Sequence, residues 1–310
     1  KYMMLFHFLA VFFMFLSIKS ETITKFSDWE INKLLSDVSC EYGTEPGIWD
    51  MNQKPGYKYD LVDAKNSCPY QGYLMEETFN SPEDPIHVLF LSDSVDVHII
   101  KSVCTILRTE MNWTISKIVD GFFKLQYESH SLLQYYEIGR FKIGMYYIPG
   151  VNPNGPYHMH LKGNAIERSK TAKEKFYDIF HATPTIIIMA SNFWDAIAWN
   201  QQNIPLSKMV ISEYMRNLAS WIQEIRYIFG SENLRIIYHT HPQPSTTTSW
   251  RSFTHALNNA GKLVAMNMSL EILDFEQIAM HFDVNELMRE EGTPPRPGIH
   301  PRDWFCMEMF

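Results

Sequence analysis

Short apolar runs recur along the chain after residue 85, and longer stretches with helical periodicity separate them. Each run is nearly continuous in apolar residues rather than alternating, as strands covered on both faces of a parallel sheet require. Strands and helices that alternate in this way predict an open, doubly wound, mostly parallel α/β sheet with helices on both faces. The predicted strands are residues 87–91, 142–148, 185–189, 234–238 and 263–266.

One predicted helix stands out, from about Ser207 to Phe229, with Gly230 as its C-cap. Its apolar residues recur at steps of three and four, which predicts one face packed in the core rather than a cofactor site. The stripe consists of Val210, Tyr214, Leu218, Trp221, Ile225 and Ile228.

An apolar run of 16 residues, 3–18, follows Lys1 and precedes ordinary polar sequence. It is shorter than the roughly 20 residues that span a bilayer and has the layout of a secretory signal peptide. We therefore predict a signal peptide at residues 1–20, with an uncleaved Golgi-type anchor as the alternative. Both readings place the chain in the secretory pathway, either secreted or in the Golgi lumen.

The chain has 310 residues, of which 45% are hydrophobic, so it can bury a large core. Cleavage near Ser20 would remove Lys1 and Lys19 and take the formal charge from −8 to −10. An acidic chain repels phosphate backbones, which argues against nucleic acid as a partner.

Residues 21–85 are rich in Gly, Pro, Asn and Tyr and show no sustained period, which indicates an irregular lobe before a domain at residues 86–310. An even number of cysteines in a lumenal protein predicts two disulfides, with three pairings open and buried free thiols as the alternative. The cysteines are Cys40, Cys68, Cys104 and Cys306. Asn112 and Asn267 lie in Asn-x-Ser/Thr sequences and are candidate glycosylation sites.

Polar residues follow several of the predicted strands, where ligands bind in sheets of this kind. Ser94 follows the first strand, Asn192 the third, and His300 lies near the C-terminus. A serine that attacks, a histidine that takes its proton and an amide that donates to an oxyanion are the parts of an acyl-transfer site.

The chain resembles the SGNH (GDSL-like) hydrolases, and within them the PC-esterase group that includes the trichome-birefringence-like polysaccharide O-acetyltransferases. The resemblance lies in five blocks: CEYGTEPGIWDMNQKPGYKYDLVDAKNSCPY from Cys40, FLSDSVDVHIIKSVC from Phe90, FKIGMYYIPGVNP from Phe141, IIIMASNFWD from Ile186, and the closing segment from Leu273 to Cys306. It implies a three-layer α/β/α SGNH-type fold with an N-terminal disulfide-stabilised lobe.

The resemblance also implies a set of roles. Ser94 would be the nucleophile, His300 the general base and Asn192 an oxyanion donor beside the backbone N–H groups of Ser94 and Gly150. Asp93 would position the turn after the strand. The implied chemistry removes or transfers small acyl groups, commonly acetyl, on sugar hydroxyls, with a glycan as partner and no metal or dissociable cofactor.

Three positions depart from the family pattern. Ser92 stands where a glycine is usual, and Val97 stands where the acetyltransferases usually have an arginine. The aspartate of the closing Asp-x-x-His motif is Pro297, and the nearest carboxylates in sequence, Glu291 and Asp303, lack the family spacing. In a serine–histidine pair the acid fixes the imidazole tautomer and stabilises the imidazolium.

Two hypotheses follow. The first is an esterase or O-acyltransferase that acts on glycans through Ser94 and His300. The second is a pseudoenzyme that uses the same crevice to bind carbohydrate or protein in an extracellular assembly.

Two His-x-His pairs, His158/His160 and His239/His241, have a spacing that zinc sites use, but no third ligand of matching placement is evident. We therefore predict no metal site, and we predict that His239 and His241 line the crevice wall. Trp194 and Asp195 are predicted to be structural.

Overall fold

The computed structural model describes residues 84–110, 115–119, 133–138, 140–152, 163–230, 234–243, 248–279, 288–291 and 296–302, together with short strands at 47–50 and 58–61. A seven-stranded sheet in the order β4-β5-β6-β3-β7-β8-β9 forms the centre of this part of the chain. Its strands are β3 (Ile86–Ser92), β4 (Ile115–Val119), β5 (Leu133–Ile138), β6 (Phe141–Tyr147), β7 (Ile186–Met189), β8 (Arg235–His239) and β9 (Glu271–Leu273).

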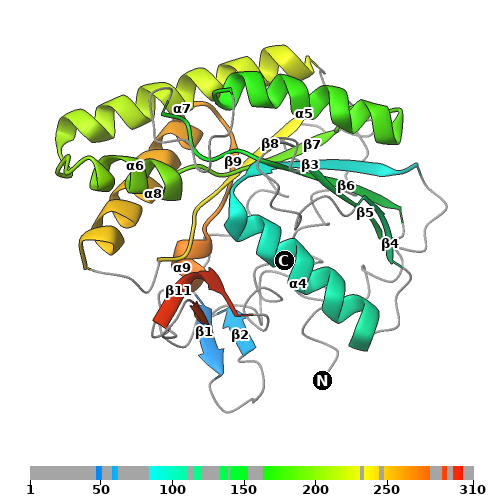
Figure 1. The fold of residues 1–310 in the computed structure, drawn as a ribbon, viewed down its shortest axis with the longest axis horizontal. Helices are drawn as coiled ribbons and strands as arrows, with labels where there is room; N and C mark the ends of the chain where they lie inside the picture. The colour runs from blue at the N-terminus through cyan, green and yellow to red at the C-terminus, as the bar shows by residue number, and fades with distance from the viewer. Residues whose placement is uncertain are drawn as a thin grey trace, which may run out of the picture.

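Five of these strands, β6-β3-β7-β8-β9, pair in parallel, whereas β4 and β5 form an antiparallel edge beside β6. Helices cover both faces of the sheet, with α5 and α7 on one face and α4 on the other (Figure 1). The helices are α4 (Ser94–Glu110), α5 (Ala165–Phe180), α6 (Phe193–Gln201), α7 (Lys208–Phe229), α8 (Thr248–Asn267) and α9 (Phe275–Ala279). The predicted three-layer, doubly wound, mostly parallel architecture is confirmed.

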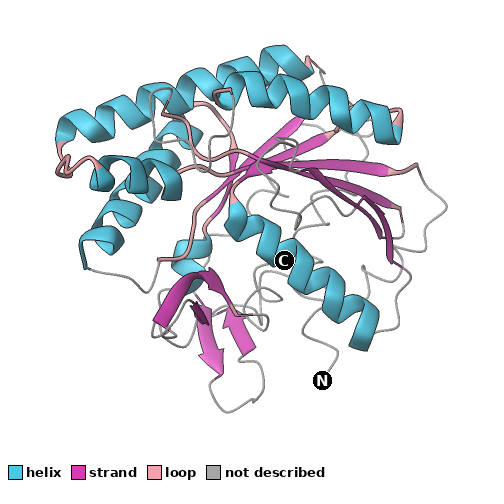
Figure 2. Cartoon of the chain, in the orientation of Figure 1, coloured by secondary structure: helices cyan, strands magenta, loops and turns pink. Residues whose placement is uncertain are grey.

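Two small antiparallel sheets lie outside the main one (Figure 2). β1 (Gly47–Asp50) pairs with β2 (Lys58–Leu61), and β10 (Met288–Glu291) pairs with β11 (Arg296–Pro301). β11 also contacts α4, which begins directly after the central strand β3.

The strands are apolar because both faces of the sheet are covered. All residues of β7 are buried, and in β3 only His87 is partly exposed. The main cluster of buried side chains joins alternate strand residues, among them Leu89, Ile187 and Tyr238, to the inner faces of α5, α7 and α8. The sheet therefore leaves polar side chains room mainly at the ends of its strands.

The predicted helix at residues 207–229 is present as α7. The Ser207 hydroxyl accepts a hydrogen bond from the Val210 N–H and caps its start, and Gly230 ends it with a φ of 43°. The whole predicted apolar stripe, including Trp221, is buried. Cap and periodicity agree, and so the sequence alone identifies this helix.

The predicted strand at residues 263–266 is wrong, because these residues form the last turns of α8. Val264 and Ala265 are buried while Leu263 and Met266 are exposed, which is helical rather than strand alternation. A four-residue apolar run cannot by itself distinguish a strand from a buried helical turn. The fifth parallel strand is instead β9, a short segment after the helix.

Most of the predicted N-terminal region lies outside the described residues. This holds for the signal peptide, for Cys40, Cys68 and Cys306, and for nearly all of the lobe at residues 21–85, so the disulfides and the domain boundaries stay predictions. Cys104 is buried on α4. Among the residues that the structure describes, none of the helices combines the length and apolar character needed to cross a bilayer.

A close contact between β8 and α8 yields a testable prediction about packing. A Cβ placed on Gly261 would lie 1.9 Å from the Tyr238 hydroxyl oxygen, and Tyr238 is fully buried. Gly261→Ala should therefore lower the free energy of unfolding by about 1–3 kcal/mol, even though alanine favours a helix by about 1 kcal/mol over glycine.

Urea unfolding measures this change, with Asn259→Ala on the exposed face of α8 as the control for helix propensity. Tyr238→Phe in the same background should recover part of the loss, because it removes the atom nearest to the new methyl group. A Gly261→Ala protein as stable as the wild type would show that the helix and the tyrosine do not pack this closely.

Candidate active site

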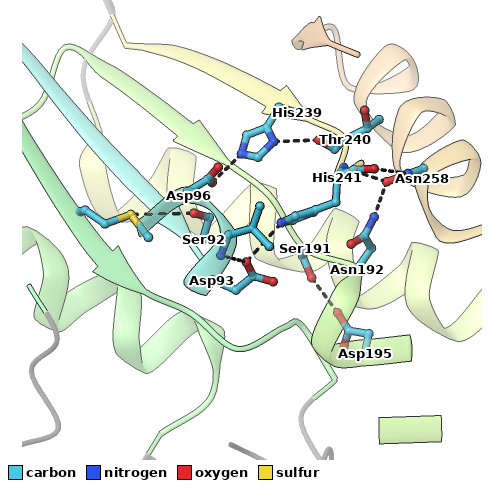
Figure 3. Close-up of polar contacts among 12 residues, drawn as sticks. Ser92, Asp93, Asp96, Ser191, Asn192, Asp195, His239, Thr240, His241 and Asn258 are labelled. Atoms are coloured by element: carbon cyan, nitrogen blue, oxygen red, sulfur yellow. Dashed lines mark hydrogen bonds and ion pairs between the residues drawn. The ribbon is translucent and has the colours of Figure 1, made fainter. Parts of the chain in front are cut away.

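The candidate site lies at the topological switch point of the sheet, where the order of the parallel strands reverses. In chain order the parallel strands are β3, β6, β7, β8 and β9, so the chain places its second strand on one side of the first and the third on the other. Ligands in doubly wound sheets bind outside the carboxyl ends of the strands at this switch point. Residues from β3, β7 and β8 converge there (Figure 3).

Ser94 is the first residue of α4 and is half-buried at the end of the central strand. The N–H groups of the first helical turn have no acceptor within the helix, and the helix dipole favours negative charge there. Asp93 holds the turn, because its Oδ1 accepts a hydrogen bond of 2.9 Å from the Val95 N–H. This position suits a nucleophile whose attack creates an oxyanion.

Asp93 also meets His241 from the end of β8, with 3.3 Å between Oδ1 and Nε2. Both side chains are buried. Burial lowers the pKa of His241, but the charge of Asp93, its hydrogen bond and the charge of Asp96 outweigh burial, and the net pKa is raised above 6.5. The buried imidazole of His241 thus offsets the negative charge of the Asp93 carboxylate next to Ser94.

A second buried pair lies beside the first. His239 Nε2 is 2.6 Å from Asp96 Oδ2, and its Nδ1 is 3.0 Å from the Thr240 carbonyl oxygen. A carbonyl can only accept, so Nδ1 carries a hydrogen and the Nε2–Asp96 contact holds one further proton between ring and carboxyl group. The rings of His239 and His241 are 5.3 Å apart, which makes the two pairs neighbours.

Asn258 of α8 links His241 to Asn192. Its Oδ1 accepts from the His241 N–H at 3.1 Å, and its Nδ2 donates to the His241 carbonyl at 2.8 Å. The same Oδ1 accepts from Asn192 Nδ2. One N–H of the Asn192 amide is thereby used to fix its orientation, and the second remains as a potential donor.

Two polar atoms in this network have no hydrogen-bond partner among the described residues, Asn192 Oδ1 and His241 Nδ1. Both belong to buried side chains. Unsatisfied buried polar atoms are rare in proteins, and each one calls for an explanation.

Asp195 of α6 fixes the loop that follows β6. Its carboxylate accepts from Ser191 Oγ at 2.7 Å, from the Asn152 N–H at 2.8 Å and from the Val151 N–H at 3.1 Å. Burial raises the pKa of Asp195, and the hydrogen bonds from these three donors lower it. Burial outweighs them, and the resulting pKa is about 6. Gly150 has a φ of 111°, and a Cβ there would lie 2.8 Å from the Asp195 carboxylate.

Arg168 of α5 holds the end of β6, where the same loop begins. The buried guanidinium donates from Nε and Nη2 to the Tyr147 carbonyl oxygen, at 2.8 and 2.6 Å. Two charged side chains from different helices therefore fix the backbone from Tyr147 to Asn152.

Two of the departures from the family pattern have a structural account. Ser92 is the last residue of β3 and is fully buried, with its hydroxyl 3.8 Å from the sulfur of Met145, so a side chain is accommodated where the family has glycine. Val97 is buried on α4.

Other predicted site residues are only partly placed. His300 and Pro297 belong to β11, but their side chains lie outside the described part of the structure, as do Glu291, Asp303, Asn112 and the His158/His160 pair. Asn267 is exposed at the end of α8. Within the described residues no group of three or more His, Cys, Asp or Glu side chains could hold a metal ion.

Several site residues were not identified from the sequence. Asp96 and Asn258 carry no motif, and each lies on a helix whose crossing over the sheet decides what it meets. Asp195 was predicted to be structural, and the structure shows the contacts by which it holds the Gly150 loop. The only available signal was its position three residues after Asn192, at the start of α6.

The Asp93–His241 pair makes a testable prediction. The imidazole pKa of His241, measured by NMR, should lie above 6.5 in the wild type. In Asp93→Asn it should fall, because the carboxylate charge that raises the pKa is gone while burial still lowers it. A raised histidine pKa stabilises the folded state at low pH, and this contribution is lost as the pH rises through the folded pKa.

The wild type should accordingly lose stability relative to Asp93→Asn as the pH rises above 6.5 through the His241 titration. Asp178→Asn, an exposed carboxylate on α5, serves as the control. An unchanged His241 titration in Asp93→Asn would show that the two side chains do not interact.

No family model matches this chain. No curated protein matches it either. Several solved structures are similar to it, GDSL-like lipases and acetylxylan esterases among them. They include a GDSL-like lipase from Parabacteroides merdae (9% identity, 74% of this chain and 95% of that chain, TM-score 0.42). An acetyl xylan esterase is also similar (12% identity, 72% of this chain and 97% of that chain, TM-score 0.43). So is a carbohydrate acetylesterase from Sinorhizobium meliloti (11% identity, 72% of this chain and 94% of that chain, TM-score 0.41). At these identities and TM-scores the likeness carries no argument about the chemistry of this chain.

Proposed function

We propose that this chain is a serine-dependent esterase or O-acyltransferase that acts on acyl esters of glycans, commonly acetyl esters. One observation carries the proposal: Ser94 begins a helix at the switch point of the sheet, and Asn192 follows the neighbouring strand. The retained serine, asparagine and late histidine of the motif resemblance supply the roles.

In the proposed reaction Ser94 Oγ attacks the acyl carbonyl carbon and its proton passes to His300. The carbonyl oxygen becomes an oxyanion, which accepts hydrogen bonds from the second Asn192 N–H and from backbone N–H groups of Ser94 and the Gly150 loop. Collapse breaks the ester bond, and the alcohol leaves with the proton from His300. Water or a sugar hydroxyl then attacks the acyl-serine by the same steps and regenerates Ser94.

The network around Asn192 supports this role. Asn258 holds the amide in one orientation and also holds the backbone of His241, which in turn contacts Asp93 beside the nucleophile. Oxyanion donors are effective when they are fixed before the charge develops, because no reorganisation is then needed. The contact between β11 and α4 is consistent with His300 acting near Ser94.

The acid partner of His300 differs from the family pattern, because Pro297 can supply neither charge nor a side-chain hydrogen bond. Ser94 and His300 would then act as a dyad, or with a carboxylate from another position. We further propose that the chain works in the secretory pathway, where the exposed Asn267 could carry a glycan.

A second candidate function rests on Pro297 itself. Loss of the acid inside a catalytic motif is expected for a pseudoenzyme, in which the same crevice binds a glycan or a protein without turnover.

The test is hydrolysis of p-nitrophenyl acetate by the purified protein, together with covalent labelling by a fluorophosphonate. Ser94→Ala should lower kcat/KM by about 10³-fold or more and abolish labelling, since removal of a nucleophile leaves only the binding and oxyanion terms. His300→Gln should lower the rate to a similar degree. Ser92→Ala, two residues away and buried, is the matched control and should keep the rate.

Equal rates for Ser94→Ala and the wild type would exclude Ser94 as the nucleophile. A folded wild type that neither hydrolyses the ester nor reacts with the fluorophosphonate, but binds an acetylated polysaccharide, would favour the pseudoenzyme.

A further inference from the structure

Asp195 connects the two segments that carry the proposed oxyanion donors. It receives the Ser191 hydroxyl from the end of β7, next to Asn192, and two N–H groups from the loop that contains Gly150. The side chain is 1% exposed, so water does not share these contacts. One carboxylate therefore connects the two segments directly.

We propose that Asp195 is a positioning residue for catalysis: its ionised form holds the Gly150 loop against the end of β7, and its protonation at acid pH loosens the oxyanion site. The inference rests on the proposed function and adds to it a positioning residue and a pH dependence. Asp195 contacts no reacting atom in this scheme and acts through Gly150 and Asn192.

The two protonation states differ in their hydrogen bonds. The ionised carboxylate accepts three charge-assisted bonds, and the Val151 N–H lies 3.1 Å from both oxygens. The protonated acid would donate from Oδ2 to Ser191 Oγ and leave only Oδ1 to accept from both backbone N–H groups. Hydrogen bonds to a charged group are about twice as strong as neutral ones, so the loop is held less firmly in acid.

The environment of Asp195 places this change at mildly acidic pH. Burial raises its pKa to about 6, the donors Ser191, Asn152 and Val151 lower it, and the charge of Asp93 raises it. Asp195 also interacts electrostatically with Tyr214 of α7 and Tyr238 of β8, whose pKa values are raised by burial, so both are neutral at this pH. Asp93 is therefore the charged group among these neighbours.

Asparagine reproduces the protonated state, because its oxygen accepts from the backbone and its NH₂ group donates to Ser191. Asp195→Asn should therefore behave at every pH like the wild type with Asp195 protonated. The experiment compares kcat/KM for p-nitrophenyl acetate in the wild type and in Asp195→Asn from pH 4.5 to 8. The ratio of the two values cancels the titration of the general base that both proteins share.

We expect the ratio to be about tenfold at pH 7.5, to approach one near pH 5, and to have its midpoint at about 6. In Ser191→Ala the loss of one donor to the carboxylate should move the acid limb to higher pH. Asp178→Asn should give a ratio of one throughout. A ratio that does not vary with pH, or an acid limb that Ser191→Ala leaves in place, would overturn the inference, since a merely structural residue gives either result.

Amide hydrogen exchange at Val151 and Asn152 tests the same inference without turnover. Protection factors at both amides should fall from pH 7.5 to pH 5 in the wild type and should be low at both pH values in Asp195→Asn. Equal protection factors in the two proteins would overturn the proposal that ionised Asp195 holds the Gly150 loop. Rates that are the same in Ser94→Ala and the wild type would instead overturn the proposed function, and the two failures are thereby distinct.

Discussion

The central strand β3 imposes the constraint on which the rest of the structure depends. Its neighbours β6 and β7 pair with it on both edges, and its side chains are covered on both faces. A strand in this position has no polar surface along its length, so groups that do chemistry collect beyond its carboxyl end. The chain turns there at Asp93, and Ser94 is the first residue of α4.

The site that results is rich in buried charge, which is costly unless each group has a partner. Asp96 meets His239, Asp93 meets His241, and Asp195 meets backbone and hydroxyl donors. None of these contacts joins residues of one helix. The first two connect the start of α4, after β3, with the end of β8, and the third connects the segments that follow β6 and β7. The polar network thus does at the edge of the sheet what apolar packing does in its interior: it fixes the relative positions of the segments.

The sequence predicted the elements whose local signals agree, and failed where a local signal has two readings. Strands β3, β6, β7 and β8 and helix α7 were predicted because apolar runs and caps fall together. Residues 263–266 were misread because a short apolar run fits a buried helical turn equally well. The prediction that the polar residues after the strands lie at the ligand-binding edge of the sheet followed from the parallel topology alone.

The partners within the site could not be read in the same way. Asp96 meets His239, which lies 143 residues later in the chain, because the first turn of α4 lies beside the carboxyl end of β8. Such a pairing depends on the angle of a helix over a sheet, and no spacing in the sequence encodes that angle. Asn258 joins His241 and Asn192 for a similar reason, since it lies on the helix packed beside β8.

The buried charge of Asp195 lowers the stability of the folded state at neutral pH. Its pKa is raised from 3.8 to about 6, so the folded state binds a proton more tightly than the unfolded chain over this range. Stability from this group therefore falls as the pH rises from about 4 to about 6, and the ionised form costs roughly 3 kcal/mol at neutral pH. A neutral side chain that made the same contacts would avoid that cost. The carboxylate thus lowers stability, and the proposed mechanism explains its presence by the firmer hold of a charged acceptor on the Gly150 loop, which a neutral residue would lack.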